Sequence, residues 1–414
     1  MKKTATQGQV SKEEIFRNAE KVFSISLVNL LREKGHDFLE HGYADTTLND
    51  SDGNRYLDCC TSSAAFNLGR RNAAIIKRFK EAIYETDQGN FIMPSQEKTL
   101  LARKISEFVP GNLDCVLYGV TRGESMEAAC KLARGFTSRP ELVTIDGACY
   151  GESGFALSLS ERKGKEQFGQ LIQSVKVIPW GDIEAARRVI GQETAAVVME
   201  PIQTENHCRT ADKSYYTQIR TLCDETGAKL IFDETQSGFG RTGTRFFFEQ
   251  FEVKPDILII GEALTSGIFP MTAMVFTAEL KDFFDIHPLI HLCTFGGHDL
   301  GCLVAMTALD EYNRLKPWEN AAYLGDLLIK ELSSLAKTSS GKIISVAGRG
   351  LLISIKLADN NMALKFCAAA RIAGMLVDTG SVDTGTVLIR PSLLIDRDDA
   401  DKILYIVART LQAI

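Results

Sequence analysis

The stretch Lys229–Gly243 reads KLIFDETQSGFGRTG, and Pro255–Gly267 follows it as PDILIIGEALTSG. Each contains a short continuous apolar run, Lys229–Phe232 and Ile257–Ile260, which ends in polar or small residues. Continuous apolar runs of this length are typical of strands buried on both faces of a parallel sheet. Polar side chains directly after such strands lie at the carboxyl edge of the sheet, where ligands bind in α/β folds. The two stretches therefore predict an α/β protein with its functional site at this edge.

Strands and helices continue to alternate upstream of these stretches. Apolar residues recur at helical spacing in some segments and run without interruption in others. This order predicts a mostly parallel sheet with helices on both of its faces. The expected elements are strands over about Cys115–Tyr118, Leu142–Ile145 and Ala195–Met199, and helices over about Glu97–Phe108, Glu124–Arg134 and Ser214–Thr226.

The pattern changes after Gly301. Helical patterns over about 303–314, 321–336 and 398–411 surround strand-like segments at 343–346 and 351–356. This mixture predicts an α+β domain, which the segment from about Asn18 to Leu57 is expected to complete. The residues from Thr46 to Cys60 predict a hairpin within that segment. We therefore divide the chain into residues 1–57 (a polar arm over 1–21 with little order, and part of the small domain), 58–300 (the large domain) and 301–414 (the C-terminal small domain).

Bulk properties exclude several classes of protein. At 414 residues the chain is longer than one ordinary domain and suits two. Its 45% hydrophobic and 24% charged residues are typical of a soluble globular protein, and the net charge of −6 argues against nucleic acid or an anionic membrane as a partner. There is no apolar run of about 18 residues and no signal peptide, so a cytoplasmic location is expected. The ten cysteines show neither zinc-site spacing nor a disulfide pattern, so we expect no metal.

The two quoted stretches together resemble the central signature of class III aminotransferases such as the ornithine, acetylornithine and 4-aminobutyrate enzymes. Those enzymes bind pyridoxal phosphate on the fold type I scaffold, which has a large domain with a mostly parallel sheet of the seven-stranded type and a smaller α+β domain. The resemblance covers about Tyr56 to Pro391. It implies that Asp233 pairs with the protonated ring nitrogen of the cofactor and that Gln236 donates to the ring hydroxyl oxygen. The alternative for Asp233 is that it only caps a turn.

Glu262 stands where the family has the lysine that forms the Schiff base with the cofactor. A carboxylate forms no imine, so covalent attachment and lysine-mediated proton transfer are both lost. Glu262 remains a candidate acid or base if a dry pocket raises its pKa. Lys254 and Lys281 are the nearest lysines in sequence, and neither falls on the matching position.

Two further segments resemble family motifs that handle the substrate. Glu200–Glu205 reads EPIQTE, and Val387–Pro391 reads VLIRP. In ω-aminotransferases the second glutamate is a removable partner of the arginine, which then binds a substrate carboxylate with two hydrogen bonds. The resemblance therefore implies substrate-binding roles for Glu205 and Arg390. An ordinary interdomain salt bridge is the alternative.

The phosphate site departs from the family pattern. The family has Ser-Gly followed by Thr or Ser at a helix start, where small residues let backbone N–H groups approach the anion. Here the matching residues are Thr121, Arg122 and Gly123. Arg122 either pairs with the phosphate or fills the cup and excludes it, and the sequence leaves both open. The aromatic residue that stacks on the cofactor ring is also replaced; Tyr150 is the candidate substitute if the backbone shifts by one residue.

Thr294 lies in CTFGGH (293–298), which resembles the family motif T-F-G-G-N. In the family this threonine crosses a dimer interface to bind the phosphate in the partner's site. Its presence implies a dimer with shared sites, formed with a second copy or with a paralogue.

Three interpretations remain. The one we favour from the sequence is an enzyme that binds pyridoxal or pyridoxamine phosphate non-covalently and acts on an amino or keto compound, with Glu262 as its acid or base. A second is a catalytically inactive subunit that completes the site of an active paralogue through Thr294. The third is an ordinary transaminase with a lysine-to-glutamate change, although a single change would leave the phosphate cup intact.

Overall fold

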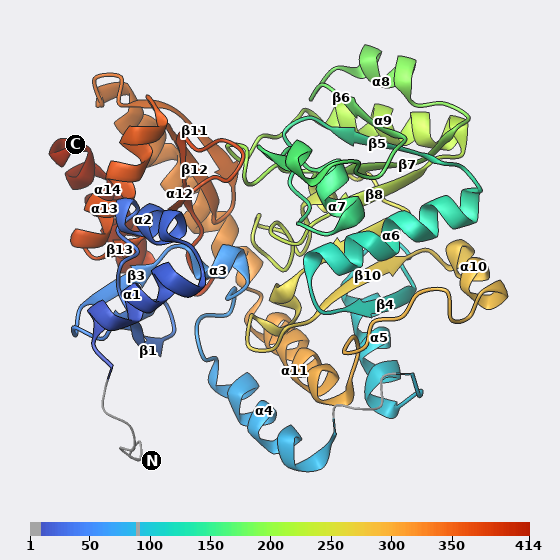
Figure 1. The fold of residues 1–414 in the computed structure, drawn as a ribbon, viewed down its shortest axis with the longest axis horizontal. Helices are drawn as coiled ribbons and strands as arrows, with labels where there is room; N and C mark the ends of the chain where they lie inside the picture. Colours follow the sequence, from blue (N-terminus) through green and yellow to red (C-terminus); the bar gives the residue numbers. More distant parts are fainter. Residues whose placement is uncertain (1–9, 88–91) are drawn as a thin grey trace.

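The computed structural model describes residues 10–87 and 92–414. Two groups of elements lie side by side in Figure 1, a large group built on a seven-stranded sheet and a smaller group built on two four-stranded sheets. Among the described residues, no helix is both long and apolar enough to cross a membrane.

The large sheet has the strand order β4-β10-β9-β8-β7-β5-β6. Its neighbours pair in parallel from β9 through β6, whereas β10 is antiparallel to both β4 and β9. The predicted mostly parallel, seven-stranded sheet is therefore confirmed, although β6 and β10 were not predicted. The strands are β4 (Cys115–Gly119), β5 (Glu141–Ile145), β6 (Val175–Ile178), β7 (Thr194–Met199), β8 (Lys229–Asp233), β9 (Ile257–Ile260) and β10 (Thr272–Phe276).

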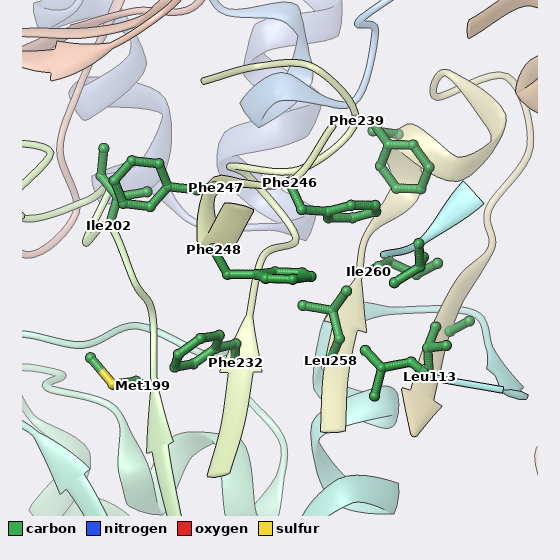
Figure 2. Close-up of a cluster of buried hydrophobic side chains, with 14 of the residues drawn as sticks. Leu113, Met199, Ile202, Phe232, Phe239, Phe246, Phe247, Phe248, Leu258 and Ile260 are labelled. Atoms are coloured by element: carbon green, nitrogen blue, oxygen red, sulfur yellow. The ribbon is translucent and has the colours of Figure 1, made fainter. Parts of the chain in front are cut away.

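Helices cover both faces of this sheet, which explains the continuous apolar runs of its strands. Leu258 and Ile260 of β9 belong to the core on one face, while Ile257 and Ile259 belong to the core on the other. Figure 2 shows Leu258 and Ile260 in the first of these cores, with Phe232 of β8 beside them. The helices are α4 (Ala73–Glu85), α5 (Gln96–Phe108), α6 (Arg122–Thr137), α7 (Gly154–Leu159), α8 (Ile183–Val189), α9 (Lys213–Thr226), α10 (Lys281–Ile286) and α11 (Asp299–Leu315). The segment labelled α3 (Thr61–Ala64) is a left-handed turn, with positive φ at all four residues.

The small group contains segments from both ends of the chain. Leu57 and Cys59 lie in the same core as residues 321–411, and β3 pairs in parallel with β13. The predicted hairpin is formed by β2 and β3. The two sheets of the small group have the strand orders β1-β2-β3-β13 and β11-β12-β15-β14. The elements are β1 (Glu40–Ala44), β2 (Thr47–Asp50), β3 (Arg55–Asp58), β11 (Ile343–Arg349), β12 (Leu352–Leu357), β13 (Met375–Leu376), β14 (Asp378–Thr379), β15 (Thr386–Ile389), α12 (Pro317–Thr338), α13 (Asn360–Ile372) and α14 (Arg397–Ala413).

Two predicted boundaries need correction. Of the arm 1–21 predicted to have little order, residues 1–9 lie outside the described residues, and the remainder forms most of α1 (Lys12–Val22), which begins after its cap Ser11. Helix α2 (Ile25–Glu33) follows and packs against α13. The predicted domain boundary at residue 301 falls inside α11, whose apolar face packs on α4 and α5 of the large group. The Tyr312 hydroxyl also donates to the backbone carbonyl of Ala263 (2.9 Å), so α11 belongs with the large sheet.

Candidate active site

Asp233, the last residue of β8, lies buried at the carboxyl edge of the large sheet. Its Oδ1 accepts hydrogen bonds from the backbone N–H (3.0 Å) and the hydroxyl (2.7 Å) of Thr235. Its Oδ2 accepts a hydrogen bond from Nε of Arg122 at 2.8 Å. Both oxygens of the carboxylate that was predicted to hold the cofactor ring are therefore bonded to other groups of this chain.

Arg122 is the first residue of α6 and reaches across two strand ends. Its Nη2 donates to Oε1 of Glu200 (2.8 Å), the residue directly after β7, while its Nε holds Asp233. The second oxygen of Glu200 accepts the backbone N–H of Cys149 at 2.9 Å. The hydroxyl of the N-cap Thr121 accepts the N–H of Glu124 (3.4 Å), and the carbonyl of Thr121 accepts the Thr272 hydroxyl (3.0 Å), which fixes the start of α6 over β10.

Two buried carboxylates thus share one guanidinium. Burial lowers the pKa of Arg122, but Asp233 and Glu200 outweigh this effect and raise it, so the guanidinium stays charged. Burial also raises the pKa of Glu200 to about 7, with Arg122 acting in the opposite direction. Removing either partner would leave a buried charge without compensation.

Glu262 begins the short 3₁₀ turn Glu262–Thr265, one residue after β9 ends, and is half-buried. Burial raises the pKa of its carboxyl. The guanidinium and the backbone N–H of Arg122 both act to lower that pKa, while the charge of Asp233 acts to raise it. Glu262, Arg122 and Asp233 therefore lie within electrostatic reach of one another at the same sheet edge.

Glycines at two points let the backbone segments of the site approach closely. A Cβ on Gly261 would lie 2.7 Å from the carbonyl oxygen of Thr235, so a side chain there would push apart the ends of β8 and β9. A Cβ on Gly123 would lie 2.7 Å from the Ser153 hydroxyl. The predicted cup residue Gly123 thus packs tightly beside the loop before α7.

A second cluster contains Glu205, Gln236 and Arg390. The sequence predicted the pairing of Glu205 with Arg390. Nη1 of Arg390 donates to Oε1 of Glu205 (3.0 Å) and to Oε1 of Gln236 (2.8 Å). Nε2 of Gln236 donates to the same Glu205 oxygen (3.2 Å), and the N–H of Ser381 donates to Oε2 (2.8 Å). Burial raises the pKa of Glu205, but Arg390 and these hydrogen bonds outweigh it and lower the pKa. The structure joins Gln236 to the Glu205–Arg390 pair, a contact that the sequence did not predict.

A cavity of about 610 Å³ lies against this second cluster. Arg390 also lines a neighbouring cavity of about 650 Å³. At the wall, Lys34 is held by Asp378 (2.6 Å). The further lining residues are mostly polar: Cys149, Arg162, Glu205, Gln236, Asn360, Thr379, Ser381 and Thr384.

The remaining candidates are separate from these clusters. Tyr150 is fully buried, and its hydroxyl donates to the carbonyl of Val198 (2.9 Å), whereas its neighbour Cys149 lines the cavity. Stacking by Tyr150 on a cofactor stays a prediction that this geometry does not favour. Thr294 is exposed on the single chain, as a residue that reaches a neighbouring subunit must be.

Sequence reasoning missed the role of Glu200. It lies in the motif that drew attention to Glu205, and its place directly after a buried strand was the available signal. The lysines nearest to Glu262 in sequence lie elsewhere: Lys254 packs against Gly111, and Lys281 pairs with Asp285 at 2.6 Å.

Comparisons with known proteins agree with this architecture. The family model described as aminotransferase class-III matches residues 38–411. An uncharacterised aminotransferase of Archaeoglobus fulgidus is 32% identical over 396 residues, 96% of this chain and 93% of the relative. A putrescine aminotransferase of Pectobacterium atrosepticum is 34% identical over 373 residues, 86% of this chain and 79% of the relative.

Solved structures share the fold at lower sequence identity. The ornithine aminotransferase of Toxoplasma gondii superposes with a TM-score of 0.89 at 22% identity, covering 98% of this chain and 96% of that one. The acetylornithine aminotransferase of Elizabethkingia anophelis has a TM-score of 0.84 at 24% identity, covering 98% and 100%. The chain thus has the fold of these aminotransferases, fold type I. The chain belongs to the class III aminotransferase family.

Class III aminotransferases use pyridoxal phosphate, and the side chains of this site do not fit that cofactor as they lie. Asp233, which the resemblance implies as the partner of the ring nitrogen, is held by Arg122 and Thr235. Glu262, which the resemblance places at the position of the family's lysine, carries a carboxylate, and a carboxylate forms no imine with an aldehyde. The cofactor ring reaches Asp233 only if Arg122 moves away.

Proposed function

We propose that this chain is a class III aminotransferase family member that does not carry out transamination in its own site. Its cavity beside Arg390 binds a small amino or keto compound when the carboxylate of Glu205 moves away from Arg390. The chain acts as a subunit of a dimer. The observation that carries this proposal is the guanidinium of Arg122, which bonds both Asp233 and Glu200 at 2.8 Å. A side chain held by two buried carboxylates is costly to displace, so the ring site stays closed to the cofactor.

The ligand class follows from the Glu205–Arg390 pair. Arg390 is buried, and its Nε has no hydrogen-bond partner among the described residues. The guanidinium therefore has at least one N–H donor left for a ligand. If Glu205 moves away, the planar guanidinium is free to bind a carboxylate with two hydrogen bonds. Relatives named for ornithine, acetylornithine and putrescine suggest the probes. Ornithine carries a carboxylate for Arg390, whereas putrescine is an amine without one and serves as the matched control.

The subunit role rests on Thr294. Losses at the cofactor site fall on residues that act within one subunit, namely Glu262 and Arg122, while the residue expected to act across a dimer interface is kept and exposed. This distribution supports a subunit that completes the phosphate site of a lysine-bearing partner. Co-expression with such a relative tests it. A mixed dimer should form, and Thr294→Val in this chain should weaken cofactor retention by the partner.

Non-covalent binding of pyridoxal or pyridoxamine phosphate, favoured from the sequence, requires Arg122 to leave Asp233. The raised pKa of Glu262 supports an acid–base role in that case. An ordinary transaminase with a changed lysine is less well supported, because the contacts of Arg122 depart from the family pattern independently of Glu262.

The deciding experiment is a titration of the purified protein with each cofactor, followed by absorbance and equilibrium dialysis. We expect no stoichiometric binding and no conversion of ornithine or a keto acid. Stoichiometric binding of pyridoxamine phosphate together with turnover of a keto acid would overturn the proposal in favour of the non-covalent enzyme. Dialysis with ornithine and putrescine alone then tests the cavity, where ornithine is expected to bind more tightly.

A further inference from the structure

The loop that carries Glu205 is closed tightly between β7 and α9. The N–H of Gln203 donates to the carbonyl of Arg209 (3.0 Å), and the N–H of Arg209 donates back to the carbonyl of Gln203 (3.3 Å). Within this loop, His207 and Cys208 have left-handed φ values of 58° and 46°. Such backbone is unfavourable for residues other than glycine, so it persists only where surrounding contacts hold it. The conformation of the loop therefore depends on what its side chains bind.

His207 makes such contacts with the small group. Its Nε2 lies 2.8 Å from the hydroxyl oxygen of Ser345 on β11, and its Nδ1 lies 3.0 Å from that of Ser354 on β12. Ser354 pairs opposite Ala347, two residues along β11 from Ser345, so both hydroxyls lie on one face of this sheet. With its proton on Nδ1, the imidazole donates to Ser354, whose hydroxyl donates to the carbonyl of Ala347 (3.3 Å), while Nε2 accepts the Ser345 hydroxyl. The sheet thus anchors the imidazole at two points.

Glu205 is bound by the same small group through its backbone as well as its carboxylate. Its carbonyl accepts the N–H of Asp383 (3.0 Å), and its carboxylate accepts the N–H of Ser381 (2.8 Å) beside the guanidinium of Arg390 (3.0 Å). A Cβ on Gly380 would lie 2.7 Å from the Glu205 carbonyl oxygen, so the loop fits closely against this turn. The small group therefore fixes where the carboxylate stands relative to the guanidinium.

The imidazole and the carboxylate are coupled by the short chain between them. Glu205 and His207 are two residues apart, so their Cα atoms lie within about 7 Å of each other. A shift of the imidazole away from the sheet would displace the backbone that carries Glu205 and weaken its bond to Arg390. A ligand carboxylate competes with Glu205 for the same guanidinium, so it gains affinity when that bond weakens.

We infer that His207 is the positioning residue of the Glu205–Arg390 pair. Anchored on Ser345 and Ser354, it keeps the carboxylate of Glu205 on Arg390 and so limits the affinity of the cavity for carboxylate ligands. This inference rests on the proposed function and deepens it, because it names what sets the selectivity between ligands with a carboxylate and ligands without one. A ligand that does not use the guanidinium is insensitive to this anchor.

The test measures ligand binding to the full chain by calorimetry, with ornithine and putrescine as the probes. His207→Ala removes the imidazole from the loop. The double variant Ser345→Ala/Ser354→Ala removes the anchor from the sheet and leaves the loop unchanged. Asn206→Ala is the matched control, because Asn206 is the neighbour of His207 in the loop and its amide donates to Gln203 within the loop (3.3 Å).

Both ways of removing the anchor are expected to raise the affinity for ornithine by about threefold to tenfold, the size of one hydrogen bond between uncharged groups. The affinity for putrescine should stay unchanged, and Asn206→Ala should alter neither ligand. On a Glu205→Gln background the negative charge to be positioned is gone, so His207→Ala should add no further gain for ornithine. A merely structural role of His207 would instead change the binding of both ligands alike.

Unchanged binding of ornithine in both anchor variants would overturn the inference and leave the proposed function intact. A parallel change for ornithine and putrescine, or a gain that persists on the Glu205→Gln background, would also overturn it. If ornithine binds no more tightly than putrescine even in Glu205→Gln, the inference and the carboxylate site of the proposed function both fail. If His207→Ala does not fold, the double serine variant decides, since its loop is unchanged.

Discussion

Replacing Arg122 by serine removes the one guanidinium that holds two buried carboxylates. The Arg122 side chain is 15% exposed, and its partners Asp233 and Glu200 are 0% and 3% exposed. Removing one partner of a buried ion pair costs about 3–5 kcal/mol, because the other charge stays buried and unpaired. We therefore expect the free energy of unfolding of Arg122→Ser to fall by about 3–5 kcal/mol at neutral pH.

The control is Arg220→Ser. Arg220 is 18% exposed and makes two contacts of 2.8 Å, but its partners Asp256 and Asp224 are 19% and 65% exposed. Water solvates these carboxylates after the substitution, so its cost is expected to be about 1–2 kcal/mol, between the values for exposed and buried pairs. Urea unfolding followed by circular dichroism and by tryptophan fluorescence measures both variants under the same conditions.

The loss in Arg122→Ser should also depend on pH. Burial raises the pKa of Glu200 to about 7 even with Arg122 present, and without Arg122 the pKa should rise further. A carboxyl whose pKa is raised in the folded state costs stability only when it is ionised. Its cost in free energy of unfolding is therefore absent below the unfolded pKa of about 4.3 and complete above the folded pKa. The variant should therefore be closer to the unmodified chain at about pH 5 than at about pH 8. A loss equal to that of Arg220→Ser, or one independent of pH, would refute this reasoning.

Three further predictions concern other parts of the site and its supports. Gly261→Ala should lower the free energy of unfolding by about 1–3 kcal/mol, since its Cβ would lie 2.7 Å from the Thr235 carbonyl oxygen; Gly191→Ala, with open space around it, is the control, and equal urea midpoints would contradict this. Glu205→Gln removes the negative partner of Arg390, so calorimetry should show tighter binding of ornithine and unchanged binding of putrescine; a parallel change for both ligands would refute a carboxylate gate. Burial raises the pKa of Glu234 to about 7, so ionisation of this carboxyl lowers the free energy of unfolding as pH rises from about 4.3 to 7. Glu234→Gln should therefore make the urea midpoint fall less steeply over this pH range. If the midpoint of the variant falls as steeply as that of the unmodified chain, Glu234 does not cause the pH dependence.

The sequence determined the fold to a large extent, because local patterns carry the information that a sheet needs. The apolar runs of β8 and β9 identify strands buried on both faces, and the polar residues after them identify the carboxyl edge. Asp233 could be placed at that edge, and the Glu205–Arg390 pair could be anticipated from two motifs. Strand β10 was missed although it is buried along its whole length like β9; its antiparallel direction is set by its pairing with β4 and β9 and not by its own residues.

Only the tertiary structure decided what Arg122 does. The sequence allowed it either to bind a phosphate or to fill the cup, since both need the same residue at the start of the same helix. The choice depends on where the ends of β7 and β8 lie relative to α6, which brings Glu200 and Asp233 within 2.8 Å of one guanidinium. The same holds for Gln236, which joins Arg390 across 154 positions of the chain. Local periodicity fixes each element, but the partner of a long charged side chain is set by how separate elements pack together.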